Sequence, residues 1–396
     1  MPTGSRQLIH DLFEHRTGGR IPWTFDFGSC KGLNPGLLPA AKKHFGAAGS
    51  LTEFLDYDIW IVLDPDRIHS DPLPHTDETI KAAIPADTIQ CMMPLKRQEG
   101  FDYERFYESE LASKQQTTET ASFDAFGLYY FSWPGHPNYV SFLSPLEQVT
   151  DLTLIKEFPM PTVDSIGFDY FKKDVSYISS KDKMSAAWSG SLYELSWYLR
   201  GRERILYDYF DNPQIVEIIV DKAAAFTEQL TQRNLEAGVD VLCFYDDLGT
   251  QASLFISPEI FRRFYKPYYK RIWQRIKKEW KGRYIFLHAC GNISQIIPDL
   301  IDCGLDILNP VQPEAIDPNR ISDQFSKDLV LWGSIGVQKT LTSGSKHDIF
   351  HEIHERVKRI GMACPLILSP ANTLPKETPL QNLDYFVEAC KEYCTG

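Results

Sequence analysis

The residues best suited to chemistry lie in His288-Ala289-Cys290-Gly291, directly after an apolar run at 283–288. Side chains two residues apart on a strand point to the same side, so the imidazole of His288 and the thiol of Cys290 converge at the end of that run. A neutral imidazole and a thiolate on one face are two of the donors that zinc takes. The spacing therefore favours a metal-site hypothesis. A buried thiol beside a histidine that bonds to backbone is the alternative.

Four aspartates stand at the ends of other apolar runs. Asp246 and Asp247 are adjacent, and neighbouring carboxylates at the mouth of a strand can have separated pKa values or can bind a cation. An aspartate that caps a helix and is followed by a turn is the alternative for this pair. Asp26 and Asp64 stand singly at the ends of two earlier runs. All four are candidate catalytic residues.

Amides and aromatic rings near the strand ends are candidates for substrate binding. Asn309 and Gln312 follow the run at 305–309 and suit the orientation of a polar ligand. Aromatic rings could line a pocket for a methylated amine or an aryl methyl ether through stacking or cation–π contacts. These rings are Trp23, Phe25, Phe27, Tyr129, Tyr130 and Trp133. Ordinary core packing is the alternative for each of them.

Eight short apolar runs, rich in β-branched and aromatic residues, must position these side chains. They span 21–27, 59–64, 185–190, 239–246, 283–288, 305–309, 329–333 and 365–369. The runs are apolar on both faces, which is typical of parallel strands covered on both sides. From the fourth run on, helical segments separate them. The count predicts an α/β fold of the (β/α)₈ barrel type, whose active sites lie at the carboxyl ends of the strands.

The segment between the second and third runs, residues 65–183, is longer than a barrel connection needs. A bare barrel takes about 250 residues, and the chain has 396. We therefore expect one barrel domain over 1–396 with an insertion at 65–183 above the catalytic face. FDAFGLYYFSW followed by PGHPNYVSFL predicts a hairpin within it. No G-x-G-x-x-G follows a candidate strand, which disfavours a dinucleotide-binding sheet.

Composition limits the partners and the compartment. The chain has 41 Lys+Arg against 53 Asp+Glu, a formal net charge of −12, which argues against a nucleic-acid partner. No run reaches the roughly 18 apolar residues that a membrane span requires. The N-terminus lacks the apolar core of a signal peptide. The eight cysteines are scattered as reduced core thiols are, so a cytoplasmic protein is expected.

Several longer blocks resemble the uroporphyrinogen decarboxylase superfamily. They are YDDLGTQASLFISPEIFRRFYKPYYKRI (245–272), HACGNISQIIPDLIDCGLDILNPVQ (288–312), LWGSIGVQ (331–338) and SPANTLPKETPLQNL (369–383), with weaker support from SLYELSWYLRG (191–201) and RIPWTFDFG (20–28). The resemblance implies a (β/α)₈ barrel, in agreement with the number of strands. It also implies one of two chemistries.

The resemblance favours methyl transfer over haem synthesis. True uroporphyrinogen decarboxylases are similar to one another in an R-Q-A-G-R block whose arginines grip the substrate carboxylates. Here the stretch after Pro22, WTFDFGSCKGLNPG (23–36), contains Lys31 and no arginine. The other branch comprises methyltransferases that work with corrinoid proteins, coenzyme M or tetrahydrofolate. Decarboxylation of a tetrapyrrole or another carboxylated substrate, with Asp26 or Asp64 as proton donor, is the alternative. A non-catalytic barrel that binds a small ligand is the third possibility.

The methyltransferase branch implies a zinc ion held by H-x-C and by a later cysteine. His288 and Cys290 match the first two ligands, but Asn372 stands where the cysteine is expected, and an amide is a poor zinc donor. Asp246, Asp247 or another donor would then complete the site, and Asn372 joins the candidates for substrate binding with Trp23, Phe25, Asn309 and Gln312. The chain has no D-x-H-x-x-G signature, so a corrinoid would be held by a separate protein. A homodimer would suit the family.

Overall fold

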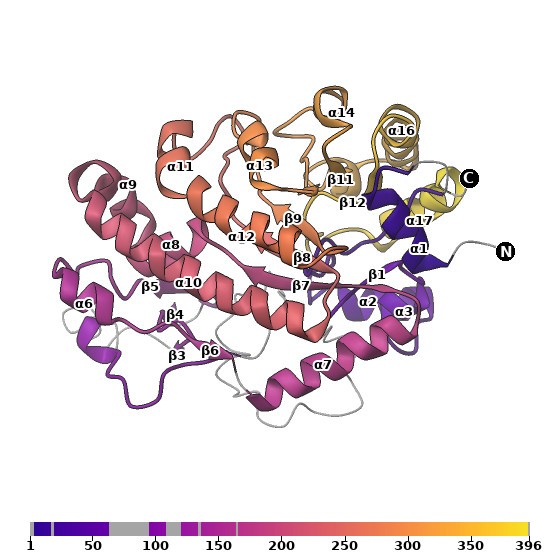
Figure 1. The fold of residues 1–396 in the computed structure, drawn as a ribbon. Coiled ribbons are helices and arrows are strands. Elements are labelled where there is room, and N and C mark those ends of the chain that lie inside the picture. The colour runs from indigo at the N-terminus through magenta and orange to yellow at the C-terminus, as the bar shows by residue number, and fades with distance from the viewer. Residues whose placement is uncertain are drawn as a thin grey trace.

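The computed structural model describes residues 4–16, 20–62, 95–107, 120–133, 136–163 and 165–394. A curled parallel sheet of seven strands forms its centre (Figure 1), in the order β1-β7-β8-β9-β10-β11-β12. The strands are β1 (Ile59–Ile61), β7 (Met184–Gly190), β8 (Val241–Tyr245), β9 (Tyr284–His288), β10 (Ile307–Asn309), β11 (Val330–Ile335) and β12 (Leu366–Pro370). Each central strand is buried along its whole length, as the apolar runs predict.

The first predicted run joins this sheet at one point. Trp23 forms a single parallel bridge with Leu368 of β12, and the backbone N–H of Thr24 donates to the Leu368 carbonyl at 3.0 Å. Seven of the eight predicted runs are therefore strands, and the first contributes one bridge. A barrel-like α/β fold is confirmed in this form, and closure by a full eighth strand stays a prediction.

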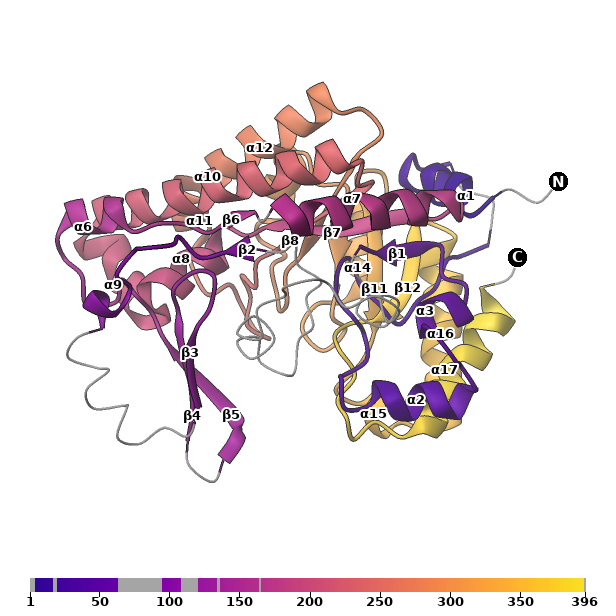
Figure 2. The same ribbon diagram turned by 90° about the horizontal axis from the view of Figure 1, so that it is seen from below.

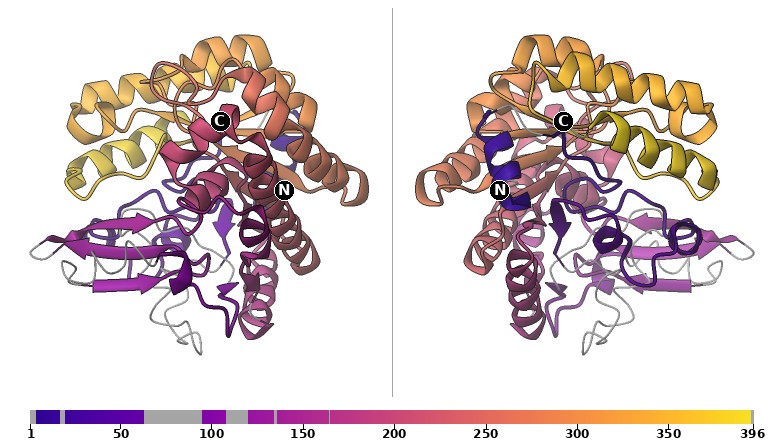
Figure 3. Two further views of the ribbon diagram at one scale, coloured as in Figure 1. Left: turned by 90° about the vertical axis from the view of Figure 1, so that its left-hand side faces the viewer. Right: turned by 90° about the vertical axis from the view of Figure 1, so that its right-hand side faces the viewer.

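Helices cover the outer side of the sheet (Figure 3). Most buried apolar residues of the helices lie in one large core, and a smaller second cluster contains Ile155, Leu199, Ile215 and Ile219. The described helices are α1 (Ser5–Phe13), α2 (Leu38–Phe45), α3 (Leu51–Phe54), α6 (Leu152–Glu157), α7 (Ser165–Ser180), α8 (Tyr193–Arg200), α9 (Arg202–Asp211), α10 (Pro213–Ala237), α11 (Pro258–Phe264), α12 (Lys266–Glu279), α13 (Ile297–Cys303), α14 (Pro318–Phe325), α15 (Thr340–Ser343), α16 (Lys346–Arg356) and α17 (Leu380–Tyr393), with short turns η1 (Glu104–Phe106) and η2 (Val357–Gly361). None of the described helices has both the length and the apolar character that crossing a bilayer requires.

A small antiparallel sheet projects from the barrel (Figure 2) and contains the predicted hairpin. It consists of β3 (Thr120–Phe123), β4 (Tyr129–Trp133) and β5 (His136–Leu143), in that order. The short strands β2 (Leu95–Lys96) and β6 (Thr162–Val163), which precede and follow this sheet in the sequence, pair with each other in an antiparallel manner. Phe142 of β5 packs on Trp197 and Tyr198 of α8. The hairpin is confirmed, while the assignment of 65–183 as one insertion stays a prediction because part of it lies outside the described residues.

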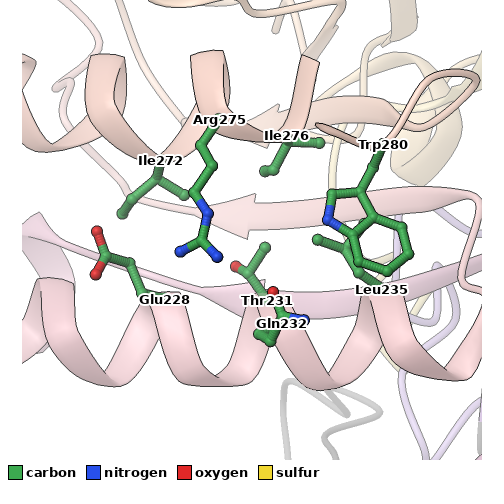
Figure 4. Close-up of a pocket in the computed structure, with 8 residues that line it drawn as sticks. All are labelled: Glu228, Thr231, Gln232, Leu235, Ile272, Arg275, Ile276 and Trp280. Atoms are coloured by element: carbon green, nitrogen blue, oxygen red, sulfur yellow. The ribbon is translucent and has the colours of Figure 1, made fainter. Parts of the chain in front are cut away.

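A cavity of about 20 Å³ lies between α10 and α12 on the outer helix layer (Figure 4). It is lined by Glu228, Thr231, Gln232, Leu235, Ile272, Arg275, Ile276 and Trp280. That volume holds about one water molecule. The cavity lies between two helices rather than at the carboxyl ends of the strands, so it does not mark the active site of a barrel.

Candidate metal centre

The register of the parallel sheet brings the ends of three strands together. Tyr245 of β8 is paired with His288 of β9, and His288 is paired with Asn309 of β10. Asp247 and Cys290 each lie two residues beyond a strand end. The carboxyl ends of neighbouring parallel strands meet at one edge, so these side chains gather where barrel active sites are built.

Asp247, His288 and Cys290 form the one group of three potential metal ligands within the described part of the chain. Their ligand atoms all lie within 4.8 Å of one another. Nε2 of His288 is 3.2 Å from Sγ of Cys290 and 3.6 Å from Oδ1 of Asp247. Nitrogen, sulfur and carboxylate oxygen are the three donor types that zinc accepts. The residues present therefore fit a zinc ion, with Asp247 as the third ligand.

Asn309 fixes the histidine in the form that can bind a metal. The Asn309 amide nitrogen donates to the carbonyl of Trp332 at 2.8 Å, so the amide oxygen faces the imidazole. This oxygen accepts a hydrogen bond from Nδ1 of His288 at 2.5 Å. The proton is thereby assigned to Nδ1, and the lone pair of Nε2 points toward Cys290 and Asp247.

Two aromatic rings enclose the imidazole. Phe27 and Tyr245 each stack on His288 with ring centroids 5.2 Å apart. The Tyr245 hydroxyl donates to the Phe27 carbonyl at 3.0 Å and accepts from the Ser29 N–H at 2.8 Å. The rings limit the access of water to His288 and hold its plane. Phe27 is thus the one aromatic candidate of the first run that contacts the cluster.

Asn372 contacts the cluster through its amide nitrogen. The Thr373 N–H donates to the Asn372 amide oxygen at 2.7 Å, which leaves Nδ2 to donate to Sγ of Cys290 at 3.3 Å. Burial and the charge of Asp247 raise the pKa of the Cys290 thiol well above its ordinary value, and the Asn372 N–H partly offsets this rise. Asn372 therefore acts as a hydrogen-bond donor to the Cys290 sulfur and not as a third metal ligand.

Two glycines let the loops after β8 and β9 touch. Gly291 has a φ of +82°, and a Cβ there would lie 2.3 Å from the carbonyl oxygen of Gly249. The Gly249 N–H donates to the Cys290 carbonyl at 3.2 Å, and the Cys290 N–H donates to Oδ1 of Asp247 at 2.8 Å. This close backbone approach holds Cys290 and Asp247 side by side.

Asp246 points away from Asp247 and anchors α8. Its buried carboxylate accepts from the N–H groups of Leu192 and Glu194, at 2.9 and 2.7 Å, and from the Ser191 hydroxyl at 2.7 Å. The Tyr269 hydroxyl is a further donor. Burial nevertheless raises the pKa of Asp246 to about 6. The geometry is that of the helix-capping alternative for Asp246, and Asp247 alone of the pair reaches the cluster.

Glu194 is a site residue that the sequence reasoning missed. Its carboxylate accepts from the Asp247 N–H at 3.4 Å, and burial together with the charges of Asp247 and Asp246 raises its pKa well above the ordinary value. The signal in the sequence was slight. Ser191 directly follows the run at 185–190, and Glu194 comes three residues after Ser191, a spacing typical of a helix N-terminus.

The remaining candidates lie elsewhere in the fold. Asp26 is buried in an ion pair with Lys31 at 3.0 Å and also accepts from the Gly32 N–H. Trp23 and Phe25 pack against Phe386 of α17. Gln312 is buried beyond the end of β10, and Tyr129 and Tyr130 are buried in β4. The side chain of Trp133 is not described, and Asp64 lies outside the described residues.

We expect Asn309→Ala to lower zinc affinity by about 10- to 100-fold, because the imidazole loses the partner that fixes its tautomer. A competition titration against a zinc-binding dye measures the change. Gln312→Ala, three residues after Asn309 and beyond the end of β10, is the matched control and should leave the affinity unchanged. Equal affinity in Asn309→Ala and the wild type would show that Asn309 does not orient His288.

The curled parallel sheet with its covering helices defines a barrel-like α/β protein. The cluster of potential metal ligands lies at the carboxyl ends of the strands, which is where the active sites of barrel enzymes lie. Residues 147–393 match the sequence model of the family described as "Uroporphyrinogen decarboxylase (URO-D)". The chain therefore belongs to the uroporphyrinogen decarboxylase family.

Relatives of two kinds are similar to the chain. A methylated-thiol–coenzyme M methyltransferase of Methanosarcina mazei is 23% identical over 204 residues, 50% of this chain and 51% of the relative. Uroporphyrinogen decarboxylase 2, chloroplastic, of Arabidopsis thaliana is 24% identical over 183 residues, 46% of this chain and 44% of the relative. The chain thus spans about half the length of these curated relatives, and both kinds are enzymes.

A solved structure supports the fold along the whole chain. A methyltransferase from Methanosarcina mazei has a TM-score of 0.60 and 15% identity, and the match covers 99% of both chains. At that identity the likeness shows a shared fold. The choice between methyl transfer and decarboxylation must come from the site.

Proposed function

We propose that this chain is a methyltransferase of the uroporphyrinogen decarboxylase family. It would move a methyl group between a small methylated substrate and a corrinoid protein, a thiol or a folate acceptor. The observation that carries the proposal is the group of Asp247, His288 and Cys290, whose nitrogen, sulfur and oxygen donors suit zinc. A bound zinc ion would keep a coordinated thiol as the thiolate, which is the nucleophile of thiol methylation.

The chain's own residues hold and shield this centre. Asp247, His288 and Cys290 supply the ligands, and Asn309 keeps Nε2 of the imidazole unprotonated. Phe27 and Tyr245 limit the access of water to the imidazole. Asn372 donates a hydrogen bond to the Cys290 sulfur and so spreads the negative charge of its thiolate.

A corrinoid partner belongs to the same proposal. The methylcobamide:CoM methyltransferase MtaA of Methanosarcina barkeri is 26% identical over 180 residues, 46% of this chain and 48% of the relative. The name of this relative describes methyl transfer from a methylated corrinoid to a thiol acceptor. The donor types of the cluster suit a reaction of this kind. The homodimer and the cytoplasmic location stay predictions from the sequence.

The N-terminal segment disfavours decarboxylation of a polycarboxylate. Lys31 is the cation that follows Pro22 there, and it is buried against Asp26 and Thr52. Asp26 in turn is 4% exposed and is engaged by Lys31 and the Gly32 N–H. A paired lysine is poorly placed to grip substrate carboxylates, and a paired carboxylate is a poor proton donor. Decarboxylation would then depend on Asp64 or on groups outside the described residues.

The test is methyl transfer by the zinc-loaded protein. Methylcobalamin is offered with a panel of small thiols and with tetrahydrofolate, and loss of methylcobalamin is followed by absorbance while the methylated product is identified by mass spectrometry. We expect transfer that falls at least about 100-fold in Cys290→Ser. Release of CO₂ from uroporphyrinogen without any methyl transfer would establish the decarboxylase instead. Ligand binding without turnover in either assay would establish the non-catalytic barrel.

A further inference from the structure

The N-terminal segment at residues 27–34, which we call the strap, runs beside the loop that follows β12. The Leu374 N–H donates to the Gly32 carbonyl at 2.8 Å, and the Asn34 N–H donates to the Leu374 carbonyl at 3.0 Å. The strap is therefore tied by backbone hydrogen bonds to the loop that carries Asn372.

The first end of the strap is a tight turn that closes around a side chain of β8. Phe27 and Cys30 exchange two backbone hydrogen bonds of 3.0 Å. The Tyr245 hydroxyl accepts a hydrogen bond from the Ser29 N–H at 2.8 Å and donates one to the Phe27 carbonyl at 3.0 Å. This turn places the Phe27 ring against the imidazole of His288, with ring centroids 5.2 Å apart. The Tyr245 hydroxyl is therefore a fixing point for the shield over the imidazole.

This fixing point is closed to water. Tyr245 and Ser29 are both buried. Gly28 has a φ of +57°, and a Cβ there would lie 2.7 Å from the Tyr245 hydroxyl, so the turn follows the hydroxyl as closely as a backbone can. Without the hydroxyl, the Ser29 N–H would be buried and would have lost its acceptor, which is costly. The turn thus depends on one oxygen atom.

The second end of the strap is fixed by Thr373, which also orients the amide beside the sulfur. The Thr373 hydroxyl donates to the Lys31 carbonyl at 3.1 Å. Its N–H donates to the amide oxygen of Asn372 at 2.7 Å, and Nδ2 of Asn372 donates to Sγ of Cys290 at 3.3 Å. One residue therefore joins the strap to the hydrogen bond at the sulfur.

The two fixing points are close together along the chain. Tyr245 binds the strap at Ser29. Thr373 binds it at Lys31, two residues further on. Neighbouring Cα atoms are about 3.8 Å apart, so a piece this short cannot absorb a shift at one point without moving the other. A disturbance at either hydroxyl should therefore reach both sides of the metal centre.

We propose that the strap couples the position of Phe27 to that of Asn372, and that Tyr245 and Thr373 are positioning residues of the metal centre which act through their hydroxyl groups. For the role of zinc the inference rests on the proposed function. There the strap would slow the release of the ion, because it shields the imidazole and holds an N–H donor against the sulfur of Cys290.

The first test is hydrogen exchange of the full chain, measured by mass spectrometry on peptides that cover 27–34 and 371–376. Tyr245→Phe removes the hydroxyl and keeps the ring that stacks on His288. We expect it to speed exchange by about tenfold in both segments, the distant one included. Thr373→Val should also speed exchange in both segments. Thr373→Ser keeps the hydroxyl and should exchange as the wild type does.

The second test is the rate at which the zinc-loaded protein releases its metal to an excess of chelator. We expect release to be about tenfold faster in Tyr245→Phe than in the wild type. Tyr284→Phe is the matched control. Tyr284 begins β9, the strand that His288 ends, and its hydroxyl donates to Glu14 at 3.1 Å. This control should leave zinc release and the exchange of both segments unchanged.

The strap would be overturned by faster exchange in 27–34 alone in Tyr245→Phe, because the hydroxyl would then support only its own turn. Zinc release at the wild-type rate in that variant would overturn it as well. If Tyr245→Phe does not fold, Thr373→Val against Thr373→Ser tests the same coupling from the other end. Hydrogen exchange needs no metal, so the two proposals fail separately. Coupled exchange in a protein that binds no zinc contradicts only the metal centre, and methyl transfer without coupled exchange contradicts only the strap.

Discussion

Protein that has been offered zinc is expected to retain close to one zinc ion per chain after gel filtration, and the His288→Ala/Cys290→Ala double variant to retain less than about a tenth of that amount. The reason is that this variant leaves Asp247 as the one donor of the cluster, and a single half-buried carboxylate holds zinc weakly. Plasma mass spectrometry of the metal and a protein assay on the same fractions give the ratio.

Three single variants sharpen this experiment. Asp247→Asn should weaken zinc retention against a chelator, because it removes the carboxylate ligand. Asn372→Cys should strengthen it, because a thiolate would replace an amide that now faces the Cys290 sulfur with its N–H. Cys303→Ala is the control for loss of a thiol, since Cys303 is buried at the end of α13.

A metal-free wild type would contradict the zinc site, as would a double variant that keeps its zinc. In either case the cluster would be a hydrogen-bonded group and not a metal centre. The search for a catalyst would then turn to the carboxyl groups of Glu194, Asp247 and Asp64, and carboxylated substrates would be tested first.

The fold was predictable because its strands are buried on both faces. Such strands appear in the sequence as continuous apolar runs, and seven of the eight runs occupy the positions of strands β1 and β7 to β12. The first run was harder to interpret. Its residues are equally apolar, but the chain turns soon after Trp23: Asp26 folds back onto Gly32, and Gly28 has a φ of +57°. Only Trp23 pairs with β12.

The metal candidates were predictable in part for a similar reason. The spacing of His288 and Cys290 has the period of two that places side chains on one face of a strand. The same rule puts adjacent residues on opposite faces, so Asp246 and Asp247 could not both reach one site. Which of them did so depended on the N-terminus of α8, which lies more than 50 residues away in sequence and binds Asp246. Glu194 was missed because its contact with Asp247 has the same long-range origin.

This division of the two aspartates leads to the largest stability effect that we expect. Asp246→Ala should lower the free energy of unfolding by about 3–5 kcal/mol, because two backbone N–H groups and two hydroxyls in the interior lose their acceptor and the first turn of α8 loses its anion. Asp247→Ala should change it by less than about 1 kcal/mol, since its side chain is 38% exposed. Urea unfolding followed by circular dichroism measures both.

Substitutions at the same two positions should have the opposite ranking in their effect on zinc binding. Asp247→Ala should fold normally and lose zinc affinity, while Asp246→Asn, which keeps an acceptor for α8, should be less destabilised than Asp246→Ala and should keep the zinc. If Asp246→Ala unfolds at the wild-type urea concentration, Asp246 does not anchor α8. If Asp246→Asn instead loses the metal while Asp247→Ala retains it, the two roles are exchanged. Adjacent residues of one type would then differ in function because the strand directs one toward the helices and the other toward the site.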